Sequence, residues 1–167
     1  MRSRLVRVPV GLLAGVLLIA LVREAAAETW RLYKNARYGT AAEYPADLFR
    51  PGRPPDNGDG QSFTAKDGAQ LAIFAGFNID NHTPANYEQF LRSGSSDYQN
   101  VTYRATGGNW LILSGYRGDS IFYEKYIFAL GKDVDVIQGL VVTYGSAGKA
   151  RYDPIVARMA RSLRPSR

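Results

Sequence analysis

Acidic and amide side chains alternate with glycine in residues 56–60, the first segment of this sequence that could do chemistry. Asp56, Asn57 and Asp59 carry the oxygen ligands that calcium prefers. A calcium loop of the EF-hand type needs such ligands at its first, third and fifth positions, but glycine occupies the third and fifth here. We interpret the segment as a turn whose side chains bond their own backbone, and we keep Asp56, Asn57 and Asp59 as candidate binding residues.

His82 is the single histidine of the chain and the second candidate for chemistry. Histidine is suited to acid–base catalysis near neutral pH, but it needs a nucleophile or carboxylate beside it. Its place directly before Thr83, where a helix is predicted to begin, favours packing at the helix start. Neither Ser114 nor Ser146 has the flanking glycines of a nucleophile elbow. We therefore assign no catalytic residue.

Composition excludes several classes of protein. The chain has no cysteine, which rules out a disulfide framework, a cysteine metal site and a cysteine nucleophile. One histidine cannot form a multi-histidine metal site, and no metal or cofactor is predicted. With 46% apolar and 22% charged residues, the chain is too hydrophobic to be intrinsically disordered. Its 167 residues suit one domain.

The first 27 residues have the pattern of a secretory signal peptide. Arg2, Arg4 and Arg7 precede an uncharged run at 8–22, and three alanines at 25–27 follow. The uncharged run is shorter than the roughly 20 residues of a permanent membrane helix, so an uncleaved anchor is the weaker alternative. We predict export, cleavage near Ala27, a periplasmic or secreted location, and no stable membrane span afterwards. Residues 28–167 then form a single globular domain.

Charge argues against nucleic-acid binding. The first 27 residues carry four arginines and one glutamate, so they supply +3 of the formal charge of +6. Five of the remaining basic residues are arginines at the C-terminal end: Arg151, Arg158, Arg161, Arg164 and Arg167. Without them the body of the domain is weakly acidic. We predict that this protein does not bind nucleic acid.

Alternating apolar patterns and turn signals define the elements of this domain. Strands are predicted at 29–33, 40–44, 61–65, 69–77, 101–106, 110–115, 120–130 and 134–144, with loop at 50–60. Threonine–proline at 83–84 and aspartate–proline at 153–154 predict the starts of two helices. Glu124 and Lys125 should face opposite sides of their strand, and one facing the interior requires a partner. The pattern predicts an α+β domain, an antiparallel sheet of six to eight strands flanked by two main helices.

Several phrases resemble a group of small exported bacterial proteins without an assigned function. These are residues 35–39, 44–49, 56–60, 67–69 and 152–156, and the resemblance covers nearly all of 28–167. The opening phrase, with its tyrosine–glycine and tyrosine–proline pairs, is similar to that of the PsbP-like superfamily. This resemblance implies an antiparallel sheet between helices and a binding or assembly role, and it supplies no catalytic residues.

Together these features favour an exported, non-enzymatic binding or accessory protein whose partner is an unknown envelope protein or component. Two other hypotheses stay open. One is a small hydrolase or ligand-binding enzyme that uses His82 or the loop from Asp56 to Asp59. The other is a structural domain stabilised by calcium.

Overall fold

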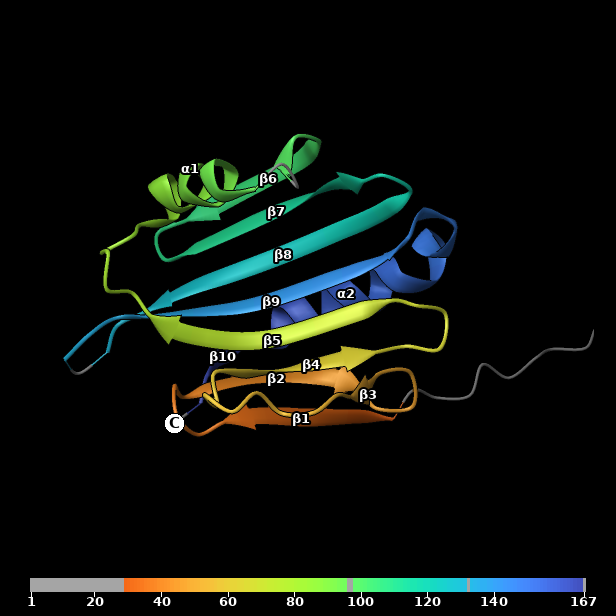
Figure 1. Ribbon diagram of the computed structural model, residues 1–167, viewed down its shortest axis with the longest axis horizontal. Helices are drawn as coiled ribbons and strands as arrows, with labels where there is room; N and C mark the ends of the chain where they lie inside the picture. The colour runs from red at the N-terminus through yellow and green to blue at the C-terminus, as the bar shows by residue number, and fades with distance from the viewer. Residues whose placement is uncertain (1–28, 96–97, 132, 167) are drawn as a thin grey trace, which may run out of the picture.

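The computed structural model describes residues 29–95, 98–131 and 133–166, so the predicted signal peptide at 1–27 lies outside the described residues. Figure 1 shows the chain as strands and helices around one large sheet. Within the described residues the order is β1 (Trp30–Asn35), β2 (Thr40–Pro45), β3 (Arg50–Pro51), β4 (Gly60–Thr64), β5 (Gln70–Phe77), α1 (Pro84–Gly94), β6 (Val101–Gly107), β7 (Trp110–Arg117), β8 (Ser120–Ala129), β9 (Val136–Gly145), the 3-10 turn η2 (Ser146–Gly148), α2 (Lys149–Ser162) and β10 (Arg164–Pro165).

Seven strands form the large sheet, in the order β3-β4-β5-β9-β8-β7-β6, and β1, β2 and β10 form a small sheet beside it. The strand pairings of the described residues are antiparallel. Helix α2 lies behind the large sheet, and α1 lies in front of it near β6 and β7 (Figure 1). The predicted α+β fold, with an antiparallel sheet between two main helices, is confirmed.

Two hydrophobic cores lie on the two faces of the large sheet because alternate residues of a strand point to opposite sides. On the α2 face, Ile121 and Leu140 pack with Ile155 and Met159 of the helix. The opposite face buries a second cluster, in which Tyr87 and Leu91 of α1 pack against Leu111, Leu113, Phe122, Tyr126 and Ile137. Each helix therefore fixes one side of the same strands.

Helix α1 begins where the threonine–proline pair predicts. The Thr83 hydroxyl accepts a hydrogen bond from the Asn86 backbone at 3.4 Å, and the Asn86 side chain accepts one from the Thr83 backbone at 2.8 Å. Pro84 lies in the first turn. A backbone N–H in that turn has no acceptor within the helix, so proline loses no hydrogen bond there. This reciprocal cap confirms the predicted helix start.

Helix α2 corrects the prediction that it starts at Asp153 and Pro154. It begins at Lys149, and Pro154 lies inside the helix. An internal proline removes one hydrogen bond to the carbonyl four residues earlier, which here belongs to the exposed Ala150. The added turn carries Tyr152, whose ring is buried against Phe49 and Tyr144. Packing of this tyrosine outweighs the local preference of proline for a helix start.

Two short strands were not predicted. Arg50 and Pro51 form β3 within the segment expected to be loop, and they pair with Thr64 and Phe63. Proline is tolerated there because β3 is the outer strand of the sheet. β10 pairs with β2 after the end of α2, which returns the chain to its first hairpin.

In the described part of the chain, no helix is long and apolar enough to cross a membrane.

Candidate functional site

The face of the large sheet that packs against α2 is only partly covered by the helix. α2 packs mainly on β2, β8 and β9. Beside the helix, a groove of about 340 Å³ opens over β6, β7 and β8. We call it the tyrosine groove, and its lining is Thr102, Tyr103, Ser114, Gly115, Tyr116, Ile121, Tyr123, Tyr144, Lys149, Asp153, Val156 and Ala157.

Strand register brings the tyrosines of this groove together. Residues paired across antiparallel strands share a face and lie close to one another. The register forms two such rows, Tyr103–Ser114–Tyr123 across β6, β7 and β8, and Tyr116–Ile121–Tyr144 across β7, β8 and β9. Four tyrosines from four strands are thus gathered beside one helix.

These tyrosines become more exposed toward the outer strands. Tyr103 is 54% exposed and Tyr116 is 38% exposed, whereas Tyr144 is buried near the helix. Burial raises the pKa of Tyr123 to about 12, with a smaller contribution from nearby Tyr103. Burial, followed by the hydrogen bond to Asp153, also raises the pKa of Tyr144. Tyr123 and Tyr144 therefore stay neutral at physiological pH and offer apolar rings with polar hydroxyls.

One ion pair closes the helix side of the groove. Lys149 bonds Asp153 one turn further along α2. The Tyr144 hydroxyl donates to the other oxygen of Asp153 at 2.9 Å. The Asp153 carboxylate, mainly through its hydrogen bond, raises the pKa of Lys149. The groove thus carries balanced charge at this side, and its carboxylate is already engaged.

This chemistry suits binding. The Ser114 hydroxyl donates to the carbonyl of Phe122 at 2.7 Å, so its proton is engaged by the backbone. The Asp153 carboxylate accepts from both Lys149 and Tyr144. Exposed aromatic faces with hydroxyl groups at their edges are typical of recognition surfaces.

The predicted binding residues of the 56–60 segment lie elsewhere, before β4 and far across the sheet from β6. The Asn57 side chain donates to Asp59 at 2.7 Å. Asp56 forms an exposed ion pair with Arg53 at 3.5 Å. Within the described ranges, no group of three or more histidine, aspartate or glutamate side chains is arranged to hold a metal ion. A binding role for Asp56, Asn57 and Asp59 stays a prediction.

His82 lies at the start of α1, away from both segments. Its ring packs against those of Tyr87 and Phe90, with centroids 5.3 and 4.5 Å away. The Asn78 side chain bonds both the N–H and the carbonyl of His82, each at 2.8 Å. The ring atom Nε2 lies 3.8 Å from an oxygen of Asp80. The ring is therefore built into the helix start.

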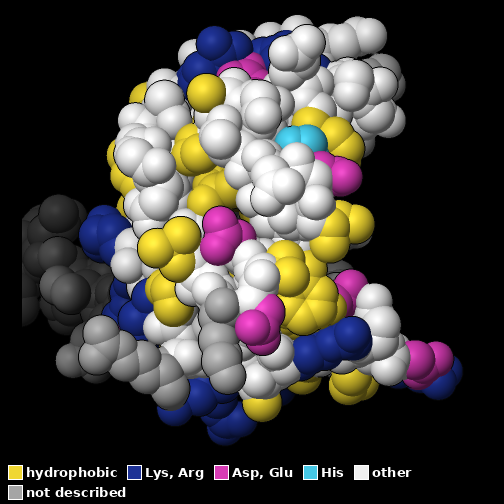
Figure 2. Space-filling model, turned by 90° about the vertical axis from the view of Figure 1, so that its left-hand side faces the viewer, with side chains coloured by type: hydrophobic (Ala, Val, Ile, Leu, Met, Phe, Trp, Pro, Cys, Tyr) yellow, Lys and Arg dark blue, Asp and Glu magenta, His cyan; other side chains and the backbone are white. Residues whose placement is uncertain are grey.

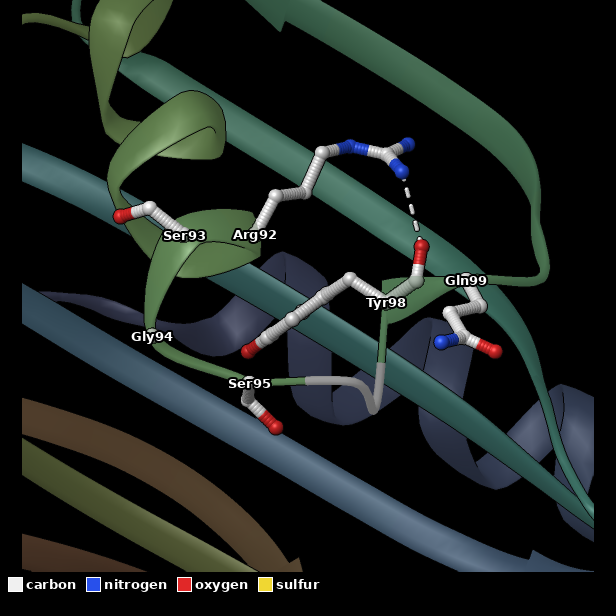
Figure 3. A pocket seen from close by; sticks show the side chains of 6 residues that line it. All are labelled: Arg92, Ser93, Gly94, Ser95, Tyr98 and Gln99. Carbon is white, nitrogen blue, oxygen red and sulfur yellow. Dashed lines mark hydrogen bonds between the residues drawn. The ribbon is translucent and has the colours of Figure 1, made fainter.

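A second recess, of about 410 Å³, lies at the C-terminal end of α1 (Figure 3). Its walls come from one stretch of chain: Arg92, Ser93, Gly94, Ser95, Tyr98 and Gln99. Its charged side chain, Arg92, donates to the carbonyl of Tyr98 at 2.8 Å and to Glu88 at 2.7 Å. Because these donors are engaged within the protein, the tyrosine groove is the stronger candidate site.

Sequence reasoning allowed that some tyrosines could line a groove, but it did not identify these four or place the groove, although part of the signal was available. Tyr116 and Tyr123 lie on the two strands that the turn at 117–119 joins. A hairpin with this turn pairs Tyr116 with Ile121. The register across β6 depends on an irregularity between Val101 and Tyr103, which no simple alternation predicts. α2 lies beside these tyrosines only because the fold brings together segments that are far apart in the sequence, and no local pattern predicts that.

The fold described above, an antiparallel sheet between helices, is a PsbP-like fold, as the resemblance implied. It is similar to the solution structure of the cyanobacterial PsbP protein CyanoP from Synechocystis sp. PCC 6803, with a TM-score of 0.57 at 10% identity. That similarity covers 92% of this chain and 98% of CyanoP.

The Ran-binding protein Mog1p of Saccharomyces cerevisiae is also similar, with a TM-score of 0.52 at 10% identity over 83% of this chain and 96% of Mog1p. LpqN of Mycobacterium tuberculosis matches at 15% identity over 80% of this chain and 76% of LpqN, with a TM-score of only 0.39. No protein-family model and no curated protein sequence matches the chain. At these identities, CyanoP and Mog1p establish the fold alone.

Proposed function

We propose that this protein is an exported, non-enzymatic binding protein that takes a segment of a partner protein in the tyrosine groove. The observation that carries this proposal is the pair of tyrosine rows beside α2, with Tyr103 and Tyr116 exposed at their outer ends. Tyrosine combines a large contact area with few rotatable bonds, and it is enriched where proteins bind one another.

The position of the groove favours an extended segment. β6 is the outer strand of the large sheet, so its outer edge has backbone groups that an added strand could pair with. A segment lying along β6 would place alternate side chains over the exposed rings of Tyr103 and Tyr116. In this proposal an aromatic or aliphatic side chain of the segment packs against these rings, and its polar neighbours face Lys149 and Asp153, which also line the groove.

The similarity to Mog1p supports a binding role in one respect. Mog1p is described as a Ran-binding protein, so the same fold serves to bind a protein in that case. For this chain, export rests on the predicted signal peptide. N-terminal sequencing of the protein from the periplasm or culture medium should find a new end directly after Ala27, and an intact N-terminus there would contradict cleavage.

The binding experiment compares three forms of the purified protein against envelope extract. We expect wild type and the control Leu32→Ala, which alters an exposed apolar side chain on β1 of the small sheet, to retain the same partner. The double variant Tyr103→Ala with Tyr116→Ala should bind that partner at least tenfold more weakly when both are purified. Equal affinity of the double variant would overturn the groove as the binding site. Failure of wild type to retain any protein would overturn the protein-partner proposal.

A further inference from the structure

A second exposed surface lies at the end of the large sheet where β5 and β8 finish and β9 starts. We call it the strand-end face and define it by Phe77, Ile79, Leu130 and Val134. Their exposed fractions are 53%, 75%, 92% and 41%, although the ring of Phe77 also contacts that of Tyr38, with centroids 5.0 Å apart. Figure 2 shows this end of the molecule, where hydrophobic side chains lie in several groups separated by other side chains.

Pairing between strands brings these residues together from distant parts of the sequence. Phe77 and Ala129 both pair with Val136, from the two sides of β9. The Asn78 backbone then donates to the carbonyl of Asp135 at 2.7 Å, which ties the segment after β5 to the start of β9. The loops that carry Ile79 and Leu130 are therefore neighbours at this end of the sheet.

The loop after β5 is held in place by side-chain bonds. The Asn78 side chain bonds His82 through two hydrogen bonds of 2.8 Å and so closes the loop that presents Ile79. In the other loop, the Gly131 backbone donates to the Asp135 carboxylate at 3.2 Å. Ile79 is thus displayed by a preorganised loop, which lowers the entropic cost of binding.

Acidic side chains surround this apolar surface. Asp80, Asp133 and Asp135 are exposed in the same two loops, and Figure 2 shows acidic groups among the hydrophobic ones. The basic residue described nearby, Arg37, stacks its guanidinium over Tyr38 and donates to the carbonyl of Asn57. Lys132 lies outside the described residues, but its charge belongs to the second loop, so the two loops carry three aspartates against one lysine. Their net charge is negative, which favours a partner of the opposite charge.

We propose that the strand-end face docks a partner protein segment in which lysine or arginine alternates with apolar side chains. The apolar groups would cover Ile79 and Leu130, and the basic groups would meet Asp80, Asp133 and Asp135. This surface is distinct from the tyrosine groove. The strand-end face lies at the start of β9, and Tyr144 of the groove lies near the other end of this strand. β9 has ten residues. At roughly 3.4 Å per residue, the two surfaces are therefore about 30 Å apart.

The test uses three short synthetic peptides and the purified, isotope-labelled protein. One peptide alternates lysine with leucine, the second has glutamate in place of lysine, and the third has serine in place of leucine. We expect only the lysine–leucine peptide to bind and to shift the amide signals of 77–80 and 130–135. Because charge steers the contact, added salt should weaken binding. Equal binding of the glutamate–leucine peptide would overturn the proposal.

Two sets of variants locate the contact. Ile79→Ser with Leu130→Ser, and separately Asp80→Asn with Asp133→Asn, should each weaken binding of the lysine–leucine peptide at least tenfold. Leu32→Ser, which alters an apolar side chain of similar exposure on β1, should leave it unchanged. The groove variant Tyr103→Ala with Tyr116→Ala should also leave it unchanged, so the two proposals can fail separately.

Other occupants give different results. If wild type binds phosphatidylcholine vesicles through Leu130 and ignores all three peptides, the face is a membrane contact and the proposal is overturned. If wild type forms dimers that Leu130→Ser abolishes, and again ignores the peptides, a second copy of the chain occupies the face and the proposal is also overturned. Sedimentation with vesicles and analytical ultracentrifugation distinguish these outcomes.

Discussion

In the interior of the protein, the hydroxyl of Tyr98 donates a hydrogen bond to a carboxylate oxygen of Glu124, with 2.9 Å between the two oxygens. Glu124 is 1% exposed, and it also accepts from Tyr126 at 2.8 Å and from Arg117 at 2.6 Å. The guanidinium of Arg117 lies over the ring of Phe122, with 4.3 Å to its centroid. A buried carboxylate is tolerated only when its oxygens are paired, and here three donors pair them. The bond from Tyr98 ties the segment between α1 and β6 to the centre of the sheet.

Removing this carboxylate should strongly destabilise the protein. Glu124→Ala removes the acceptor that Arg117 and two tyrosine hydroxyls share, and breaking a buried ion pair typically costs about 3–5 kcal/mol. Denaturant unfolding followed by circular dichroism measures the change in the free energy of unfolding. The matched control is Glu43→Ala, which removes a more exposed partner of Arg158 and should cost about 1 kcal/mol or less. Similar losses in both variants would contradict the role of the Glu124 network.

Alkaline pH should unfold this protein through its buried tyrosines. Burial raises the pKa of Tyr123 to about 12, and burial also raises the pKa values of Tyr98, Tyr126, Tyr144 and Tyr152. In the unfolded chain tyrosine titrates near pH 10. Above that pH the unfolded chain loses protons that the folded chain keeps, so the contribution of these tyrosines to stability is constant below about pH 10 and falls as pH rises further.

The measurement combines denaturant unfolding at a series of alkaline pH values with tyrosinate absorbance. A Tyr123→Phe variant should lose less stability between about pH 10 and pH 12 than wild type, because the phenylalanine has no proton to release. Absorbance of the folded protein should show a group of tyrosines that ionise only on unfolding. Titration of every tyrosine near pH 10 in the folded protein would contradict this prediction.

Local signals predicted much of this fold. The hairpins at 67–68 and 117–119 and the cap at Thr83 depend on neighbouring residues, and the structure contains them as expected. Pairing of β5 with β9 joins segments far apart in the sequence, and no local pattern specifies it. The start of α2 depends on where Tyr152 packs, which overrides the signal of Pro154. The tyrosine groove and the strand-end face are products of such long-range pairing, so sequence reasoning turned instead to Asp56, Asn57, Asp59 and His82.

Gly115 should not tolerate a side chain. A Cβ atom there would lie 2.0 Å from the carbonyl oxygen of Asn100 and 2.9 Å from the Cα atom of Val101, and both are backbone atoms that cannot rotate away. We expect Gly115→Ala to destabilise the protein by about 1–3 kcal/mol. Gly76→Ala is the control, because it also lies in a strand but has no atom within 4 Å of the added Cβ. It should be neutral or slightly stabilising, since alanine restricts the unfolded chain. Thermal unfolding of both variants tests the difference.

Thr83 should stabilise α1 through its cap. Its hydroxyl accepts from the Asn86 backbone, and Thr83→Ala removes that acceptor from the first turn of the helix. Loss of such a cap typically costs about 1 kcal/mol. Thr83→Ser keeps a hydroxyl at the same position and should restore most of the stability. Hydrogen exchange should be faster in the first turn of α1 in Thr83→Ala than in Thr83→Ser. If both variants were equally destabilised, with unchanged exchange at Asn86, the methyl group of threonine rather than its hydroxyl would be the stabilising feature.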